Sequence, residues 1–336
     1  MAPQKNGVVY IDDPIHGEAI DFLRQRHQVI CGFGAEAVDF EEVSAQVEVI
    51  LVRTGRISSE MIASAPKLKV IARHGVGTDA IDIQAAHRQS VHVLITPQAN
   101  AISVAEHTIG LLFAAARQYS AADSIVREGL FVDRDRLVGL ELAGKTLAIA
   151  GFGRVGARVA QIAEAIGMHL RVYDPYLPSE SRPKTIEFFG DLESLLSGAD
   201  ALTLHLPLTP ASKGMIGGKE LDRLKVGAIV VNTARGGLID EAALARRLVS
   251  GRLSGAGIDV FSSEPEPPLN SPLLTAPSVF LTPHTGAHTS AAMRKMAVHA
   301  ADGISAVLRD DQLPNSVVTV QQSMDPARPV NLGRNT

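Results

Sequence analysis

The sequence contains very little cysteine, few aromatic residues and no tryptophan. Cys31 is its one cysteine, which excludes an internal disulfide and a metal site built from several cysteines; a small buried side chain is the common role of such a residue. The formal net charge of −4 gives no broad positive field, so we do not expect nucleic acid to bind. The histidines show no ligand-like spacing with acidic residues, so we expect no metal site.

Long hydrophobic runs are also missing. The most apolar stretch, residues 109–116, is too short to cross a bilayer, and the first residues lack the apolar region of a signal peptide. We therefore expect a soluble, cytoplasmic protein without membrane contact. The 336 residues exceed what one hydrophobic core usually supports, so the length predicts two domains.

Two series of alternating strands and helices are present. The first has strands expected at Val8–Ile11, Val47–Val52, Leu68–Ala72 and Val91–Ile95, with helices at 17–26, 59–64 and 82–89. The second has strands expected at 146–150, 169–174, 201–205, 228–232, 255–259 and 279–282. Such alternation predicts α/β domains with parallel sheets covered by helices.

A long helix is expected between the two series. Ser103 and Glu106 have the spacing of a capping box, and Gly129 is a plausible stop. The helix would have about 25 residues, or ~38 Å at 1.5 Å per residue. It could join two domains or lie in the core of one. Another helix is expected at about 289–308, with Met296 and Ile304 on its buried face together with Met293 and Val307.

A glycine motif follows the first strand of the second series. Gly151, Gly153 and Gly156, with Arg154 and Val155 between them, fit the pattern G-x-G-x-x-G between a strand and a helix. The first glycine permits a tight turn, the second lets the backbone approach a pyrophosphate, and the third lets helix and strand pack closely. The pattern alone is weak, since a structural glycine turn would look the same; its context favours a dinucleotide site.

An acidic residue completes this motif. Asp174 ends the next expected strand, 23 positions after Gly151. Its carboxylate can accept hydrogen bonds from ribose hydroxyls and would repel a 2′-phosphate, so NAD is the expected cofactor. Arg171 and Arg182 are close in sequence and leave some use of NADP open.

Three loops after later strands contain the residue types of a dehydrogenase site. They hold Arg235, Glu264 and His284. Because the carboxyl ends of parallel strands share one edge, we expect the loops to converge there. His284 could act as general acid, Glu264 could favour its protonated form, and Arg235 could bind a carboxylate in a bidentate manner. Taken singly, each is more often a turn residue or a surface charge.

Together these segments resemble the D-isomer-specific 2-hydroxyacid dehydrogenase family, from about Val8 to Val320. The resemblance is strongest over residues 142–156, 230–240, 255–265 and 282–286. It implies two Rossmann-like, doubly wound parallel-sheet domains with a cleft between them. The substrate domain would be discontinuous, with residues 1–100 and 285–320, the NAD-binding domain would span 101–284, and 321–336 would be a tail. It also implies a homodimer that pairs through the NAD-binding domain.

The resemblance extends to further site residues. Ala234 and Asp259 would meet the nicotinamide carboxamide, and His205 and Pro207 would lie beside the adenosine; we also assign Thr233 and Gly286 to the cofactor site. Amides around Val76 and Gly77 would receive the substrate carboxylate. Arg53 and Arg73 resemble positions that hold the phosphate in phosphoglycerate dehydrogenases, although surface charges are an equal alternative. His74 could influence the choice of substrate or simply pack.

The predicted function is that of an NAD-dependent D-2-hydroxyacid dehydrogenase acting on a small molecule, with 3-phosphoglycerate as the first choice of substrate. Reduction of hydroxypyruvate or glyoxylate is the alternative within the same chemistry. An NAD-sensing scaffold, like corepressors of this architecture, is an alternative of a different class; the Arg235, Glu264 and His284 set argues against it. The residues after about 320 are too few for a regulatory domain, so we expect no feedback through one.

Overall fold

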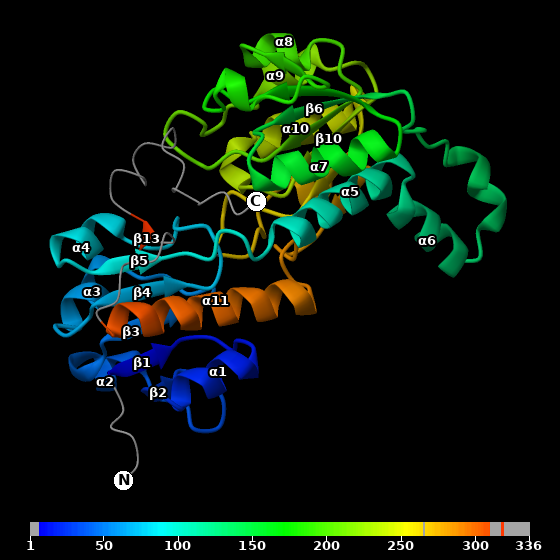
Figure 1. Ribbon diagram of the computed structural model, residues 1–336. Coiled ribbons are helices and arrows are strands. Elements are labelled where there is room, and N and C mark those ends of the chain that lie inside the picture. Colours follow the sequence, from blue (N-terminus) through cyan, green and yellow to red (C-terminus); the bar gives the residue numbers. More distant parts are fainter. Residues whose placement is uncertain (1–6, 265, 310–316, 319–336) are drawn as a thin grey trace. The chain divides into compact units, whose positions relative to one another are not determined.

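The structure is a computed structural model that describes residues 7–264, 266–309 and 317–318. The chain divides into two compact units, unit 1 with residues 1–100 and 288–336 and unit 2 with residues 101–287. Each unit contains its own β-sheet (Figure 1). The predicted tail at 321–336, and residues 310–316 and 319–320 of the predicted substrate domain, lie outside the described residues.

Unit 1 is built on a sheet in the order β13-β5-β4-β3-β1-β2, in which β13 is antiparallel to β5 and the other five strands run parallel. The order of these five matches a common doubly wound topology. The strands are β1 (Val8–Ile11), β2 (Gln28–Cys31), β3 (Val49–Val52), β4 (Val70–Arg73), β5 (His92–Leu94) and β13 (Val317–Val318). The helices are α1 (Gly17–Arg24), α2 (Phe40–Val43), η1 (Ser44–Gln46), α3 (Ser59–Ser64), α4 (Ile83–Arg88) and α11 (Ser290–Leu308).

Helices cover both faces of this sheet. On one face, Leu23 of α1 and Ala297 and Ile304 of α11 pack against the strands, and on the other Ile62 of α3 does so. Of the predicted stripe on α11, Met296 and Ile304 are buried, and Met293 and Val307 are partly buried. The strands therefore lie between two apolar layers, which explains their continuous hydrophobic runs.

Unit 2 has seven parallel strands in the order β12-β11-β10-β9-β6-β7-β8. The order reverses between β6 and β9, and ligands of such sheets bind beyond the carboxyl ends of strands at this point. The strands are β6 (Thr146–Ala150), β7 (His169–Tyr173), β8 (Glu187–Phe189), β9 (Ala201–Leu204), β10 (Ala228–Asn232), β11 (Leu253–Ile258) and β12 (Val279–Leu281). The helices are α5 (Ala101–Ala116), α6 (Tyr119–Arg127), η2 (Phe131–Arg136), α7 (Arg154–Ala165), η3 (Ser179–Ser181), α8 (Leu192–Leu196), α9 (Gly218–Arg223), η4 (Gly236–Leu238), α10 (Glu241–Val249) and η5 (Pro272–Leu274).

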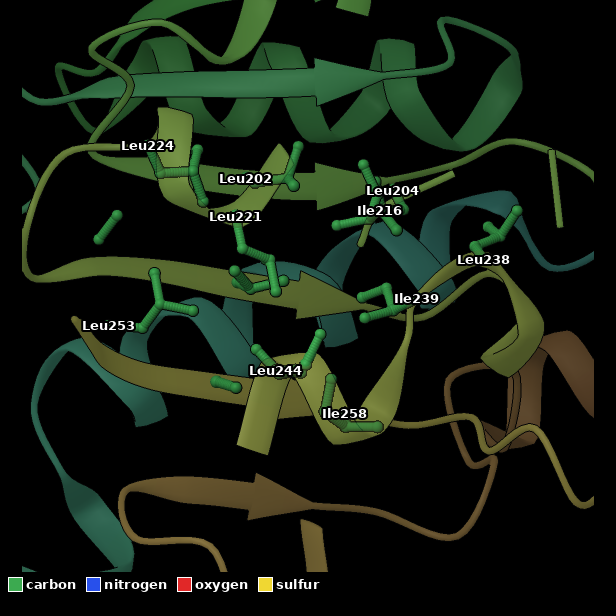
Figure 2. Packing of buried hydrophobic residues seen from close by; sticks show 14 of the residues in the cluster. Leu202, Leu204, Ile216, Leu221, Leu224, Leu238, Ile239, Leu244, Leu253 and Ile258 are labelled. Carbon is green, nitrogen blue, oxygen red and sulfur yellow. The ribbon is translucent and has the colours of Figure 1, made fainter. Parts of the chain in front are cut away.

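The core of unit 2 also has two layers. Leu202 and Leu204 of β9 pack with Leu221 of α9 and Leu244 of α10, as Figure 2 shows. Ala201 belongs to the layer on the other face, which α5 and α7 cover. Successive residues of a strand point to opposite faces, so one short strand supplies both layers. None of the helices in the described ranges is long and apolar enough to span a membrane.

The prediction of one long helix before unit 2 is wrong. The segment forms two helices, α5 ending at Ala116 and α6 starting at Tyr119, and Gln118 between them has a φ of +51°. The carbonyl of Ala116 accepts a hydrogen bond from the amide of Leu140 at 2.7 Å, so a distant segment ends α5. The capping box is also wrong, because Ser103 and Glu106 lie inside α5, which begins at Ala101. Gly129, with a φ of +73°, follows α6 and ends it as expected.

Candidate active site

The glycine-rich turn after β6 has the geometry that its motif predicts. Gly151 has a φ of +98°, and a Cβ there would lie 2.6 Å from the carbonyl oxygen of His205. A Cβ on Gly156 would lie 2.1 Å from the carbonyl oxygen of Gly151. Both positions therefore require glycine for the fold itself. They also hold the turn directly against the end of β9, where His205 begins the next loop.

Gly153 differs from its two neighbours. Its backbone is extended, with a φ of −72°, and a Cβ would meet no atom within 4 Å. None of the residues that the structure describes requires glycine here, whereas a ligand approaching the backbone would. The residue immediately precedes α7, whose first amides and partial positive charge suit a pyrophosphate. Arg154 and Val155 form the first turn of α7, and burial lowers the pKa of the Arg154 guanidinium. These residues fit a dinucleotide.

Asp174 lies beside the glycine-rich turn, as expected. One carboxylate oxygen accepts a hydrogen bond from the amide of Phe152 at 2.7 Å, and the other from the amide of Tyr176 at 2.9 Å. A carboxylate has further acceptor sites, so ribose hydroxyls could still bind. These contacts hold a negative charge beside the glycine-rich turn.

His205 lies at the end of β9, next to the turn, with Pro207 two residues further on. Burial lowers the pKa of His205 to about 3, so its imidazole is neutral at physiological pH. One ring nitrogen lies 3.1 Å from the hydroxyl of Thr203. A neutral ring suits a position beside an adenosine better than a charged ring would.

The loop with Arg235 follows β10. The side chain of Asn232 shapes it, donating to the carbonyl of Arg235 at 2.8 Å and accepting from the amide of Ala234 at 3.1 Å. The Arg235 guanidinium donates to the carbonyl of Ala234 at 2.6 Å. Gly236 packs so closely that a Cβ would lie 2.0 Å from the carbonyl carbon of Phe261. The loop of Arg235 is thus in direct contact with the loop that leads to Glu264.

Glu264 and His284 form a hydrogen-bonded pair. Nδ1 of His284 lies 2.5 Å from Oε2 of Glu264, and Oε1 accepts from the amide of Phe261 at 2.7 Å. Both side chains are partly exposed. Among the described residues, Nε2 of His284 has no hydrogen-bond partner, so this nitrogen can meet a substrate. Arg235, Glu264 and His284 all lie on loops that follow the carboxyl ends of neighbouring strands, as the sequence predicts.

Asp259, at the end of β11, holds the loop that contains His284. Its buried carboxylate accepts hydrogen bonds from the hydroxyl of Thr282 at 2.6 Å and from the amides of Thr285 and Gly286 at 2.8 and 2.9 Å. Burial alone would raise the pKa of Asp259, but the hydrogen bonds that its carboxylate accepts lower the pKa below its ordinary value. Among these hydrogen bonds, the one from His107 has the largest effect on the pKa. The structure thus gives Asp259 a structural role in this loop, whereas its contact with nicotinamide stays a prediction.

In unit 1, Arg53 and Arg73 lie at the ends of adjacent strands, because Val52 is paired with Arg73. The Arg53 guanidinium donates to the carbonyl of Pro14 at 3.2 Å and lies 3.2 Å from Nε2 of His288. The backbone amide of Arg53 donates to Asp12. Sequence reasoning placed the two arginines but missed Asp12 and His288, whose proximity comes only from the fold.

The loop after β4 contains the other predicted substrate residues. His74 is buried and one ring nitrogen lies 3.2 Å from the carbonyl of Met293; burial lowers its pKa to about 4. This environment favours packing over substrate contact. Val76 is exposed, and among the described residues no backbone group accepts from its amide or that of Gly77. These two amides suit an incoming carboxylate.

Two residues of α5 that the sequence reasoning missed also contact the site. Nε2 of His107 lies 3.0 Å from the hydroxyl of Thr282, and the hydroxyl of Thr108 lies 2.7 Å from that of the buried Thr233. Both belong to a stretch that looked like an ordinary apolar helix.

Comparisons with known proteins agree with this geometry. Residues 109–286 match the family described as D-isomer specific 2-hydroxyacid dehydrogenase, NAD binding domain. A D-3-phosphoglycerate dehydrogenase from Methanocaldococcus jannaschii is 42% identical over 92% of this chain, which spans only 59% of that protein's length. A hydroxypyruvate reductase from Thermotoga maritima is 38% identical over 88% of this chain and 96% of its own length.

A solved structure shows the same architecture. The TT0316 protein from Thermus thermophilus has a TM-score of 0.84 and 34% identity, covering 93% of this chain and all of that one. The family assignment therefore rests on the matched segment and on these relatives, and the strand order and the glycine-rich turn agree with it. The chain belongs to the D-isomer specific 2-hydroxyacid dehydrogenase family, and its unit 2 contains that family's NAD-binding domain.

Proposed function

We propose that the protein interconverts a D-2-hydroxy acid and its 2-oxo acid, with NAD as the cofactor. The observation that carries the proposal is the 2.5 Å hydrogen bond between His284 and Glu264. The loop of Glu264 is also in contact with the loop of Arg235. This reaction needs a general acid, a residue that favours the protonated form of that acid, and a cationic side chain that binds the substrate carboxylate. Family membership gives the stereochemistry and the reaction class.

Each side chain has a defined part in the reduction. When bound, the nicotinamide supplies the hydride that the reduction consumes. His284 donates a proton from Nε2 to the former carbonyl oxygen, while Nδ1 stays bonded to Glu264. Because the Glu264 carboxylate is negative, it favours the protonated ring that this step requires. Arg235 binds the substrate carboxylate and orients the carbonyl.

The cofactor is bound by unit 2. Its pyrophosphate would meet the turn at Gly153, with Arg154 beside it, and its adenosine ribose would meet Asp174. Thr233, Ala234, Asp259 and Gly286, which follow β10, β11 and β12, would lie towards the nicotinamide. Since the Asp259 carboxylate already accepts from the loop of residues 284–286, only part of its acceptor capacity is left for the cofactor.

Unit 1 serves as the substrate domain in this proposal, with 3-phosphoglycerate as the first choice of substrate. Arg53 and Arg73 at adjacent strand ends can bind a phosphate, and the amides of Val76 and Gly77 a carboxylate. The curated relative from Methanocaldococcus jannaschii is named for this substrate. The hydroxypyruvate reductase from Thermotoga maritima, whose length the chain nearly matches, supports hydroxypyruvate as the second candidate.

A homodimer through unit 2 is part of the proposal. No residue of α6, which Figure 1 labels, is buried. The large hydrophobic residues Tyr119 and Val126 of α6 and Phe131 and Val132 of η2 are exposed. A cavity of about 760 Å³ beside them is lined by Arg117, Leu137 and Leu140, among others. A second copy of this chain would cover these groups, and sedimentation analysis of the mass in solution tests the dimer.

Location in the cytoplasm stays a prediction that cell fractionation tests.

The test of the function is a panel of 2-oxo acids followed by NADH absorbance. The panel holds phosphohydroxypyruvate, hydroxypyruvate, glyoxylate, pyruvate and a branched 2-oxo acid. Preference for phosphohydroxypyruvate supports the phosphate role of Arg53 and Arg73, and Arg53→Gln should then raise KM for that substrate far more than for glyoxylate. Preference for an uncharged side chain keeps the enzyme class and rejects the phosphate site. NADH binding without turnover on any member would contradict the proposed activity.

A further inference from the structure

Helix α5 packs closely on the strands that precede the candidate catalytic loops. A Cβ on Gly257 of β11 would lie 2.7 Å from the Cβ of Leu111, and one on Gly255 would lie 3.3 Å from the carbonyl oxygen of Ala115. The two glycines let the helix approach the strand, and so the side chains at the beginning of α5 reach the loops at the strand ends.

His107 of α5 donates a hydrogen bond into the loop of His284. Its Nε2 lies 3.0 Å from the hydroxyl of Thr282 and 3.2 Å from a carboxylate oxygen of Asp259. The Thr282 hydroxyl gives its own proton to Asp259 at 2.6 Å, so its oxygen accepts from His107. Nε2 of His107 must therefore carry a proton, and the neighbours define its tautomer.

Asp259 in turn is hydrogen-bonded to the loop that contains His284. Besides the side-chain contacts, the carboxylate accepts from the amides of Thr285 and Gly286, and the carbonyl of Asp259 accepts from the amide of His284 at 2.8 Å. His284 has a φ of +53°, which residues other than glycine seldom adopt. The hydrogen bonds to Asp259 hold this backbone, and with it the direction of the imidazole towards Glu264.

Thr108, the next residue of α5, contacts the other loop. Its hydroxyl donates to the carbonyl of Val104 at 2.7 Å, so it accepts from the hydroxyl of Thr233 at 2.7 Å. Thr233 is two residues before Arg235. Two consecutive residues of α5 thus contact the two loops: His107 contacts the loop of His284, and Thr108 contacts the loop of Arg235.

We propose that His107 is a positioning residue for His284, acting through Asp259 and Thr282. The proposal rests on the proposed function, because it assigns His107 a part in the proton transfer of His284. Loss of the His107 hydrogen bonds loosens the 284–286 loop and weakens the pairing of His284 with Glu264. Within unit 2, the charged side chains on the loops that follow β10, β11 and β12 are those of Arg235, Asp240, Asp259, Glu264 and Glu266. A purely structural histidine would change the stability of the fold and leave the reaction's pH dependence unaltered.

The test compares His107→Leu with His107→Gln. Glutamine can place an N–H near the position of Nε2, whereas leucine cannot. His169→Leu, at an exposed histidine of the same unit, is the matched control. For reduction of the best 2-oxo acid by NADH, we expect His107→Leu to lower kcat by roughly tenfold and to move the pH–rate profile towards acid. KM for NADH should change less, and His107→Gln should recover most of kcat and the profile.

The proposal is overturned if His107→Leu keeps the wild-type pH–rate profile, or if His107→Leu and His107→Gln lose kcat equally. NMR of the His284 imidazole protons separates this failure from failure of the proposed activity, since it needs no turnover. If the wild-type chain reduces no member of the panel, a shifted His284 signal in His107→Leu but not in His107→Gln still supports positioning, and an unshifted signal rejects it. If leucine at 107 prevents folding, Thr282→Val removes the intermediate hydroxyl and should give the same signature.

Discussion

Nδ1 of His284 and Oε2 of Glu264 lie 2.5 Å apart, while the second oxygen of Glu264 is held by the amide of Phe261. The carboxylate is therefore fixed by the backbone of its own loop and presents its other oxygen to the ring. This leaves Nε2 of His284 as the ring nitrogen that is available to a substrate in the proposed reaction.

Glu264→Gln tests the charge of this contact. The amide oxygen of glutamine can still accept from Nδ1, but without negative charge it no longer favours the protonated ring. Since the reduction uses that form, we expect the reductive pH–rate profile to move towards acid and kcat at pH 7 to fall by about tenfold or more. Initial rates with NADH between pH 5 and 9 measure both. An unchanged profile with an unchanged rate would remove Glu264 from the mechanism.

Arg235→Lys tests bidentate binding of the substrate carboxylate. Lysine keeps the charge but loses the planar fork, so KM for the 2-oxo acid should rise by about tenfold and kcat should fall. The control is Arg246→Lys, on the exposed side of α10, which should leave both constants unchanged. Equal kinetics for the two variants would show that Arg235 does not bind the carboxylate.

A pair of alanine variants separates cofactor binding from folding in the glycine-rich turn. At Gly153 a Cβ would meet no atom of the described part of the chain within 4 Å, so Gly153→Ala should leave the melting temperature unchanged and raise the Kd for NADH by about tenfold or more. At Gly156 a Cβ would overlap the carbonyl of Gly151, so Gly156→Ala should lose about 2 kcal/mol of stability or more. Calorimetry and NADH fluorescence titration measure the two effects. Unchanged NADH affinity in Gly153→Ala would place the pyrophosphate elsewhere.

His74 should make the stability of unit 1 depend on pH. Burial holds its folded-state pKa at about 4, whereas an unfolded histidine titrates near 6.5. The unfolded chain therefore binds the proton first as the pH falls, so stability is full above about 6.5 and declines towards about 4, by about 1.4 kcal/mol per pH unit. In His74→Gln, denaturant titrations should show a smaller decline, while His299→Gln, at an exposed position, should keep the wild-type slope. Equal slopes in all three proteins would contradict the assignment.

Most of the sheet architecture could be predicted from the sequence, because buried parallel strands are continuous hydrophobic runs. The strands that the sequence did not reveal, β2, β8 and β13, all lie at sheet edges. In β2 and β8 the residues are partly or fully exposed, so no apolar run marks these two strands. The break between α5 and α6 was missed for a different reason. The carbonyl of Ala116 is taken by Leu140, a contact across 24 residues that no local pattern encodes.

The candidate site divides in the same way. Arg235 and His284 lie three residues after the ends of β10 and β12, and Glu264 lies six residues after the end of β11. Strand positions and residue types were therefore enough to propose them. His107 contacts Asp259 across 152 residues, and Thr108 contacts Thr233 across 125. Only the packing of α5 against β11 brings these pairs together. Single-sequence patterns show which residues stand at a strand end, but they do not show which helix lies behind it.

The close contact of Gly236 with the backbone at Phe261 bears on how such a protein can change its substrate during evolution. The loops of Arg235 and Glu264 are fixed to each other by main chain against main chain, and the substrate plays no part in this contact. Side chains that face the ligand can then be exchanged while the reacting groups keep their places. Selection for a new 2-oxo acid would therefore leave position 236 invariant as glycine and act on residues such as Arg53 and Arg73.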